Sequence, residues 1–480
     1  MKKTLRLALA MVVFALTDAT EGQTLKNLVH PPPNGADLTF LLTDGTVMAQ
    51  GDGLSDWWKL TPDINGSYLN GTWSKVASLQ RGYKPLYFAS AVLADGRLVI
   101  TGGEYNNGRF ALTNLGAVYD PVANTWTPLA APPGWDFIGD SPALVLPDGR
   151  FLIGRKLDMQ VAALDPATLT WTLLGNTGKS DFNAEEGWTL LPNGTVLTCD
   201  VLDAPNSERY FPDLETWQTA GSTIVDLHSP PTEGCIPYGP HGEFCYNPPG
   251  EIGPAILRPD GTVFQTGSSS LTGAGHTAIW TPGPNSNDPG SWAVGPDFPN
   301  GDNAGDSFAS LLPNGNVLVL GSFSLYEFDG VNLTPTVSAS GCLMVLPTGE
   351  TMVGGSQLYT SANTTFQRAW APKIKRFPAT VTRGQTYQLV GTQFNGLSQA
   401  AAYGDELETA TNYPIVRITN KATKHVFYAR THDHSTMGVA TGSAPVSTSF
   451  DVPAATESGA SSLEVVANGI PSKRVAITVN

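Results

Sequence analysis

Acidic residues recur at one fixed position of a repeated sequence pattern. Asp140, Glu185 and Asp306 each stand eight residues before a two-residue turn, and Glu251 lies one residue from the corresponding place. If the repeats fold alike, these carboxylates converge, and like charges brought together raise one another's pKa. Proton transfer and binding of a divalent cation both use such groups. Another repeat has Tyr87 at this offset, so Tyr87, Asp140, Glu185 and Asp306 are our candidate catalytic residues.

Two histidines could add nitrogen ligands. His432 and His434 alternate along a predicted strand, so both side chains project from one face and could bind one metal. If this segment reaches the acidic residues, His432, His434 and Glu251 are candidate ligands for calcium, zinc or copper. A local interpretation is also open, because Asp and Ser often bond nearby backbone and His-Asp-His can form a polar turn.

The elements that must position these residues are seven copies of one hairpin. Each has two apolar runs around a two-residue turn, and six turns are Asp-Gly or Asn-Gly, which suit the positive φ angles of a type I′ turn. The turns begin at Asp44, Asp95, Asp148, Asn193, Asp260, Asn314 and Thr348. Their spacing is typical of kelch repeats, which have a period of about 50 residues. We therefore predict an all-β protein whose residues 36–370 form a seven-bladed kelch-type β-propeller.

Tryptophans follow most of the hairpins at the end of a second pair of strand-like runs. A regularly repeated aromatic residue is usually core, so we predict that they pack between neighbouring blades. They are Trp73, Trp126, Trp171, Trp217 and Trp292.

The two ends of the chain have different patterns. Residues 371–480 lack the hairpin repeat, and their short alternating runs predict an immunoglobulin-like β-sandwich. At the other end, residues 1–19 have basic residues followed by an apolar stretch, which predicts a signal peptide and export to the periplasm or the extracellular space. Residues 20–35 are expected to be a linker.

The amino-acid composition argues against nucleic acid as a partner. The chain of 480 residues has 27 Lys and Arg against 42 Asp and Glu, a formal charge of −15, and no basic stripe that would bind nucleic acid. No apolar run is long enough to predict a membrane span. Of the four cysteines, Cys235 and Cys245 bracket a short loop and could form a disulfide after export, although two separate thiols remain an alternative.

Kelch blades followed by a C-terminal sandwich resemble galactose oxidase and its relatives, the secreted copper-radical oxidases. The similarity is especially close in the stretch RGYKPLYFASAVLADGRLVITGGEYNNGRF. It implies that Tyr87 corresponds to the radical Tyr, which the family crosslinks to a Cys of the preceding blade. In this chain Ala36 stands in place of that Cys. The family also holds its copper with a Tyr-His pair, and no Tyr-His dipeptide exists here. The family's copper-binding His of the C-terminal domain lies in a Thr-His-Ser signature, which could match either Lys424-His425 or Thr431-His432.

Three functions are compatible with these observations. The first is a secreted protein that binds a glycan or another surface ligand and lacks the copper-radical site. The second is an enzyme with a carboxylate or metal site at the channel mouth, and the third is a divergent copper-dependent oxidase of sugars or alcohols. An approach of the acidic residues to within about 6 Å would favour the enzyme. Trp57, Trp58, Tyr83 and Tyr87 are candidates for stacking on sugar rings.

Overall fold

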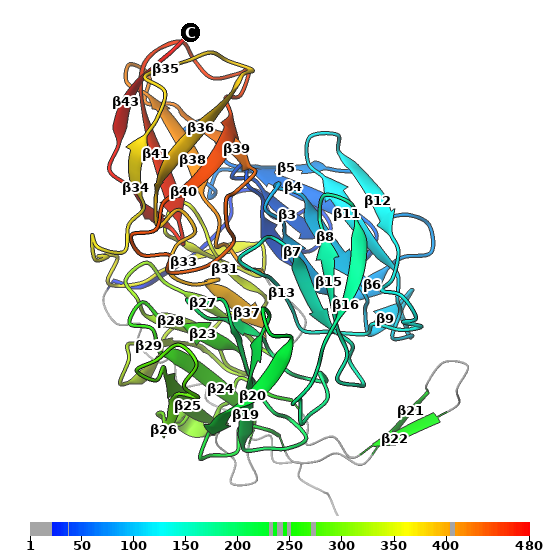
Figure 1. Ribbon diagram of the computed structural model, residues 1–480. Helices are drawn as coiled ribbons and strands as arrows, with labels where there is room; N and C mark the ends of the chain where they lie inside the picture. The colour runs from blue at the N-terminus through cyan, green and yellow to red at the C-terminus, as the bar shows by residue number, and fades with distance from the viewer. Residues whose placement is uncertain are drawn as a thin grey trace, which may run out of the picture.

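The computed structural model describes residues 22–36, 38–229, 234–237, 243–246, 251–269, 275–403 and 409–480. In this part of the chain the fold is all-β, with a single short 3₁₀ turn at Pro299–Gly301 (Figure 1). The predicted signal peptide lies outside the described residues, so export stays a prediction. Among the residues described, no helix has the length and apolar character needed to cross a membrane.

Each predicted hairpin lies in a separate antiparallel sheet, and these sheets are propeller blades (Figure 1). The first three blades contain β2 (Thr39–Leu41), β3 (Val47–Gln50), β4 (Trp57–Thr61) and β5 (Thr72–Lys75); β7 (Ala89–Val92), β8 (Leu98–Thr101), β11 (Gly116–Asp120) and β12 (Thr125–Leu129); and β13 (Ala143–Val145), β14 (Phe151–Gly154), β15 (Val161–Asp165) and β16 (Thr170–Leu174). The next two contain β17 (Thr189–Leu190), β18 (Val196–Cys199), β19 (Asn206–Phe211) and β20 (Thr216–Ser222); and β23 (Ala255–Leu257), β24 (Val263–Ser269), β25 (Gly275–Thr281) and β26 (Ser291–Val294).

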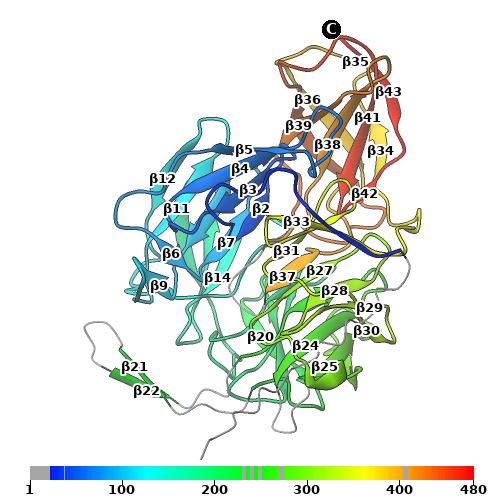
Figure 2. The ribbon, with the colours of Figure 1, turned by 180° about the vertical axis from the view of Figure 1, so that it is seen from behind.

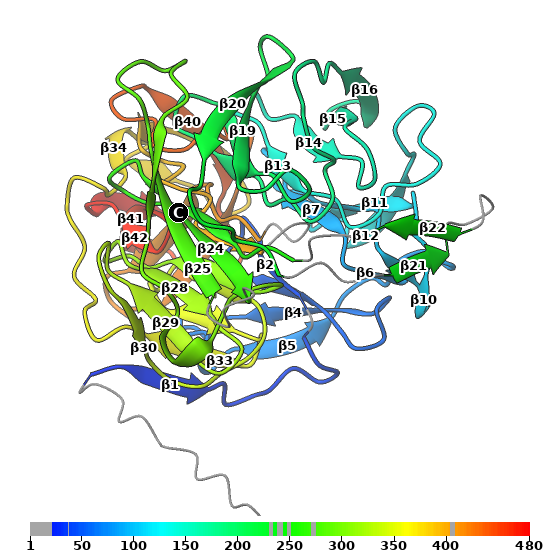
Figure 3. The same ribbon diagram turned by 90° about the horizontal axis from the view of Figure 1, so that it is seen from below.

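The remaining blades recruit strands from distant parts of the chain. One contains β27 (Phe308–Leu311), β28 (Val317–Leu320), β29 (Leu325–Phe328) and β30 (Leu333–Pro335), with β37 (Ala401–Tyr403) added beside β27. The other contains β31 (Leu343–Val345), β32 (Thr351–Val353) and β33 (Gln357–Thr360), with β1 (Thr24–Asn27) as its outer strand (Figure 3). β1 therefore places a strand inside the segment that we expected to be a linker. Since β2 also contacts β31, the sheets close into a ring.

Two small sheets lie outside the blades. One contains β6 (Pro85–Leu86), β9 (Tyr105–Asn106) and β10 (Arg109–Phe110), and the other pairs β21 (Gly234–Pro237) with β22 (Glu243–Tyr246).

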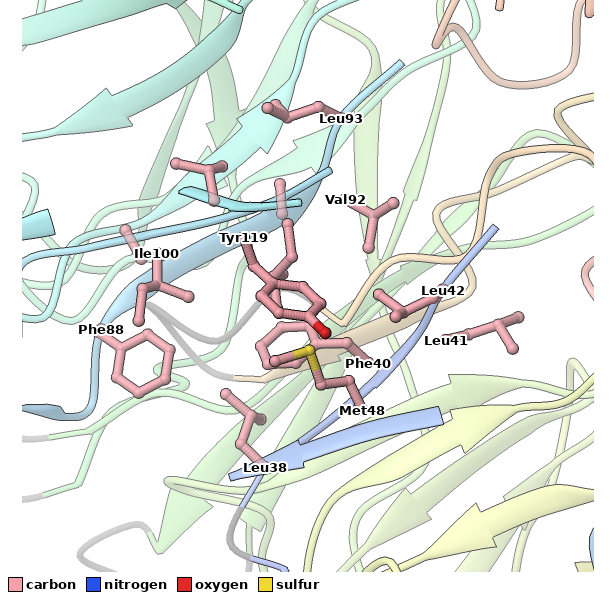
Figure 4. Close-up of a cluster of buried hydrophobic side chains, with 14 of the residues drawn as sticks. Leu38, Phe40, Leu41, Leu42, Met48, Phe88, Val92, Leu93, Ile100 and Tyr119 are labelled. Carbon is pink, nitrogen blue, oxygen red and sulfur yellow. The ribbon is translucent and has the colours of Figure 1, made fainter. Parts of the chain in front are cut away.

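Two of the predicted tryptophans, Trp126 and Trp171, lie between blades. The indole of Trp126 donates to the carbonyl of Ala77 at 3.0 Å, and that of Trp171 donates to Ala130 at 2.7 Å, so each bonds the chain that leads out of the preceding blade. Apolar side chains fill the rest of the interface. Figure 4 shows this packing between the first two blades, where Phe40 and Met48 lie against Tyr119.

The C-terminal residues form one curled mixed sheet with its own apolar core. Its strands are β34 (Lys373–Arg376), β35 (Thr380–Val381), β36 (Thr386–Thr392), β38 (Ile415–Asn420), β39 (Val426–His432), β40 (Val446–Asp451), β41 (Gly459–Ala467), β42 (Ile470–Pro471) and β43 (Val475–Val479). The sheet packs on the face of the propeller that carries the hairpin turns, since the amide of Thr431 donates to Thr43 and that of Met437 donates to Pro147.

A segment of the C-terminal region enters the ring of blades. It leaves the curled sheet after β36, and β37 pairs antiparallel with β27, so that Tyr403 lies opposite Phe308 (Figure 2). The same segment contacts β23 and β31, and the side chain of Gln399 accepts a hydrogen bond from the amide of Leu190 at 2.8 Å. Tyr403 thereby reaches the end of the inner strands that lies opposite the hairpin turns.

Candidate channel-mouth site

The inner strands bring the predicted acidic residues to one end of the ring. Asp140, Glu185, Glu251 and Asp306 each precede the innermost strand of a blade, before β13, β17, β23 and β27 respectively. Equivalent strand starts lie at one end because every inner strand runs from there toward its hairpin turn. We call these four residues, together with Lys156, Glu104 and Tyr403, the mouth cluster.

Lys156 is the cation of the mouth cluster. It follows β14, is only 4% exposed, and its ammonium lies 2.6 Å from Glu185 Oε1 while also binding Asp140 Oδ2. Burial alone would lower the pKa of Lys156, but the charges of Asp140 and Glu185 raise it well above its ordinary value. Lys156 therefore ties two neighbouring blades together as a charged group.

Glu251 connects the other carboxylates of the cluster. Its carboxyl lies within hydrogen-bonding reach of both Glu185 and Asp306, and its single proton can be donated to one of them at a time. Burial and then the charges of Glu185 and Asp306 raise the pKa of Glu251 to about 10, so its carboxyl is protonated at neutral pH. A protonated carboxyl can donate a hydrogen bond to an ionised neighbour. Glu185, Glu251 and Asp306 therefore lie close together, and Lys156 joins Asp140 to Glu185.

Asp306 and Glu104 complete the acidic part of the mouth. Asp306 is exposed at the mouth, but its carboxyl contacts Tyr403 and Glu251, and desolvation by the surrounding protein followed by the charge of Glu185 raises its pKa. Burial also raises the pKa of Glu104, with Lys156 acting against it and Glu185 and Asp306 adding to it. The mouth therefore holds more carboxylates than one ammonium can neutralise.

Aromatic rings lie beside the acidic residues. Tyr87 is 37% exposed, has a φ of 53°, and packs edge-on against Tyr105 with ring centroids 6.2 Å apart. Tyr105 in turn packs edge-on against Phe110, and Glu104 followed by burial raises the pKa of the Tyr105 hydroxyl. These three rings form what we call the aromatic rim.

Two of the other candidate stacking residues belong to the core. Trp57 is fully buried, as is Tyr83, whose hydroxyl donates to the carbonyl of Gly102 at 2.9 Å. Trp58 is half-buried, and its indole donates to Asp56 at 3.0 Å. Of the four candidates, the prominent exposed ring at the mouth is that of Tyr87.

The candidate metal ligands His432 and His434 do not meet Glu251. The amide of His434 donates to the carbonyl of Ala94, which lies in a hairpin turn. Ala94 is seven residues after Tyr87 along the inner strand, so the turn is about 20 Å from the mouth at the rise of a β-strand. His434 is buried with its Nδ1 2.9 Å from Thr448 Oγ1, and His432 lies between Asp433 and Asp451. The C-terminal sheet packs on the turn face of the propeller and so holds both histidines away from Glu251.

A different acidic group could hold a metal ion. Asp181, Glu186 and Asp200 are buried, and each offers an oxygen within 4.8 Å of the others. Among the described residues no such grouping of three ligands occurs at the mouth. We did not predict this group of three carboxylates from the sequence.

The sulfur required by the copper-radical resemblance is absent from the expected position. Ala36 stands there, next to Gly355. Cys342 Sγ lies 3.1 Å from Thr39 Oγ1, and Cys199 Sγ lies 3.6 Å from Gln265 Oε1, both inside the blades.

Comparison with solved structures gives a similar fold. A fungal alcohol oxidase of the AA5 family, solved in complex with copper, has 14% sequence identity and a TM-score of 0.51, covering 95% of this chain and 98% of that chain. A streptogramin B lyase has 11% identity and a TM-score of 0.48, covering 72% of this chain and 99% of that one. The extracellular domain of a putative one-component system from B. thetaiotaomicron has 9% identity and a TM-score of 0.46, covering 96% of this chain and 58% of that chain.

The first of these similarities shows a shared β-propeller fold with the galactose oxidase family and carries no information about chemistry at this identity. No protein-family model matches the chain, and no curated protein matches its sequence.

Proposed function

We propose that this protein is an exported enzyme that uses the mouth cluster for general acid–base cleavage of a polyhydroxylated extracellular substrate. We further infer that its architecture is a seven-bladed kelch-type propeller followed by an immunoglobulin-like domain. The observation that carries the function is the position of Glu251, within hydrogen-bonding reach of two other carboxylates. Paired carboxyl groups that share one proton can supply both an acid and a base.

The cluster gives its members different roles in this proposal. Glu251 is the proton donor, because its environment keeps the carboxyl protonated at neutral pH. Asp306 is the acceptor, since it lies on the exposed side and receives hydrogen bonds from Glu251 and Tyr403. Lys156 is a positioning residue that holds Glu185 against Glu251.

The test is cleavage of a panel of neutral, amino and acidic polysaccharides by the full-length protein. New reducing ends mark hydrolysis, and unsaturated products mark elimination. Glu251→Gln and Asp306→Asn should each lower the rate by about 100-fold, the usual contribution of a general acid or base. Asp213→Asn, at an exposed carboxylate outside the cluster, is the control. Unchanged cleavage by both mouth variants would exclude the proposed roles.

The aromatic rim favours a second candidate, a glycan-binding protein without catalysis. Tyr87 exposes its ring beside acidic side chains, an arrangement that suits stacking on a sugar and hydrogen bonds to its hydroxyl groups. Binding without cleavage, lost in Tyr87→Ala and kept in Glu251→Gln, would support this function instead. Stoichiometric copper with a radical signal would support the divergent oxidase.

A further inference from the structure

A second acidic cluster lies inside the blade, behind the mouth. Asp181 precedes β17, and its Oδ2 accepts the amides of Val201 and Leu202, each at 2.7 Å, while Oδ1 accepts the amide of Phe182 at 2.6 Å. Glu186 and Asp200 lie beside it, and all three residues are buried. The cluster therefore joins the segment before β17 to the loop after β18.

One ammonium lies in this cluster. Lys179 is buried, with its Nζ 2.6 Å from Glu186 Oε1 and 2.7 Å from Glu208 Oε2. The other oxygen of Glu208 accepts the amide of Ser180 at 2.6 Å and its hydroxyl at 2.8 Å. Lys179 thus pairs with Glu186 and Glu208, and in the described part of the chain no ammonium or guanidinium forms an ion pair with Asp181 or Asp200.

Two oxygens of the cluster have no hydrogen-bond partner among the residues that the structure describes. Both Glu186 and Asp200 are 0% exposed, and neither Glu186 Oε2 nor Asp200 Oδ1 is hydrogen-bonded. The other oxygen of Asp200 accepts a long hydrogen bond from the Ser180 hydroxyl, at 3.5 Å. A buried polar atom without a partner costs free energy, and for an ionised group this cost is especially large. These two oxygens therefore indicate a bound ligand that accepts electron pairs from them, as a metal cation does.

We propose that Asp181, Glu186 and Asp200 bind a divalent cation, and that the cation is Ca²⁺. Ca²⁺ lies 2.3–2.6 Å from its oxygen ligands, so two ligands on opposite sides of the ion are about 4.6–5.2 Å apart. The three oxygens all lie within 4.8 Å of one another, so one ion at this distance from each oxygen could contact all three. The ligands are carboxylates, which hard cations prefer, whereas zinc and copper favour imidazole or thiolate groups.

The cation would also hold a strained part of the backbone. Glu185 has a φ of 58°, which directs its side chain to Lys156 at the mouth while that of Glu186 lies in the blade. A residue other than glycine keeps a left-handed backbone conformation only where the surrounding structure holds it there. The proposed site supplies such a restraint next to the mouth cluster, but its existence does not depend on the function proposed for the mouth.

The experiment compares the full-length protein with Asp200→Asn after chelation and after addition of CaCl₂. Wild-type protein should gain about 2–5 °C in Tm with saturating Ca²⁺. Asp200→Asn should lose this gain and weaken Ca²⁺ binding, measured by calorimetry, by about 10-fold or more. Without metal, the variant should be at least as stable as the wild type, because a charge is removed from a crowded cluster. Asp203→Asn, at an exposed carboxylate on the same loop, should behave as wild type.

Terbium luminescence gives a second measurement. Trp217 lies close to the cluster, since Lys179 Nζ is 4.7 Å from its ring centroid. Tb³⁺ in the Ca²⁺ site should therefore emit when tryptophan is excited, and Ca²⁺ should displace it. If chelated wild-type protein neither binds Ca²⁺ nor shows this emission, the proposal is overturned and protons neutralise the cluster. Preferential binding of Zn²⁺ or Mn²⁺ would overturn the assignment to calcium.

Discussion

Glu185 and Glu186 are neighbours in the chain, yet their carboxylates belong to different clusters. Glu185 binds Lys156 at the mouth, and Glu186 binds Lys179 inside the blade. The positive φ of Glu185 separates them at the start of the inner strand β17. One dipeptide thus connects the proposed catalytic site to the proposed cation site.

Replacing Lys156 with Met should destabilise the protein strongly. The substitution leaves Asp140 and Glu185 buried without their ammonium, and breaking a buried ion pair typically costs about 3–5 kcal/mol. Urea unfolding should show this loss, and a second change, Asp140→Asn, should recover part of it. Arg150→Met removes an exposed pair with Asp148 and should cost less than about 1 kcal/mol. Equal losses in the two single variants would contradict the role of Lys156.

The pKa of Glu251 predicts a dependence of stability on pH. Because the folded-state pKa of about 10 exceeds the ordinary value of 4.5, the native protein binds this proton more tightly than the unfolded chain does. Glu251 therefore lowers the free energy of unfolding progressively as pH rises from about 4.5 to 10. Glu251→Gln should flatten the curve of Tm against pH in this window and raise Tm at its upper end. An unchanged slope would show that Glu251 is ionised at neutral pH.

Tyr403→Phe should destabilise the mouth cluster without altering the packing of the blades. The change removes a hydrogen bond to Asp306 and keeps the ring packed against Phe308. We expect a loss of about 1 kcal/mol in the free energy of unfolding and a further rise in the pKa of Asp306. Denaturant titration measures the first effect, and NMR titration of the Asp306 carboxyl measures the second. In Tyr105→Phe, which changes a rim residue, the pKa of Asp306 should stay close to that of the wild type.

Cys235 and Cys245 are expected to be joined in the exported protein. The register of β21 and β22 places the two residues directly opposite each other. Peptide mapping without reductant should recover a crosslinked pair, which dithiothreitol should separate. Complete alkylation of both cysteines in the native protein would exclude the bridge.

The sequence by itself determined the blades. An Asp-Gly or Asn-Gly turn between apolar runs specifies a hairpin locally, because the turn requires positive φ angles and the runs require a buried face. The repeated spacing also placed Asp140, Glu185 and Asp306 before inner strands, as the structure confirms. Trp126 and Trp171 lie between blades for the same reason, since each repeat must bury its outer strands against a neighbour.

Only the tertiary structure decided which other residues join them. Tyr403 reaches the mouth through strand pairing with β27, although far separated in sequence, and Lys156 has no repeated counterpart that would reveal its role. The docking of the C-terminal sheet on the hairpin turns keeps His432 and His434 at the other end of the inner strands. Such pairings depend on contacts between distant segments, which local sequence patterns do not specify.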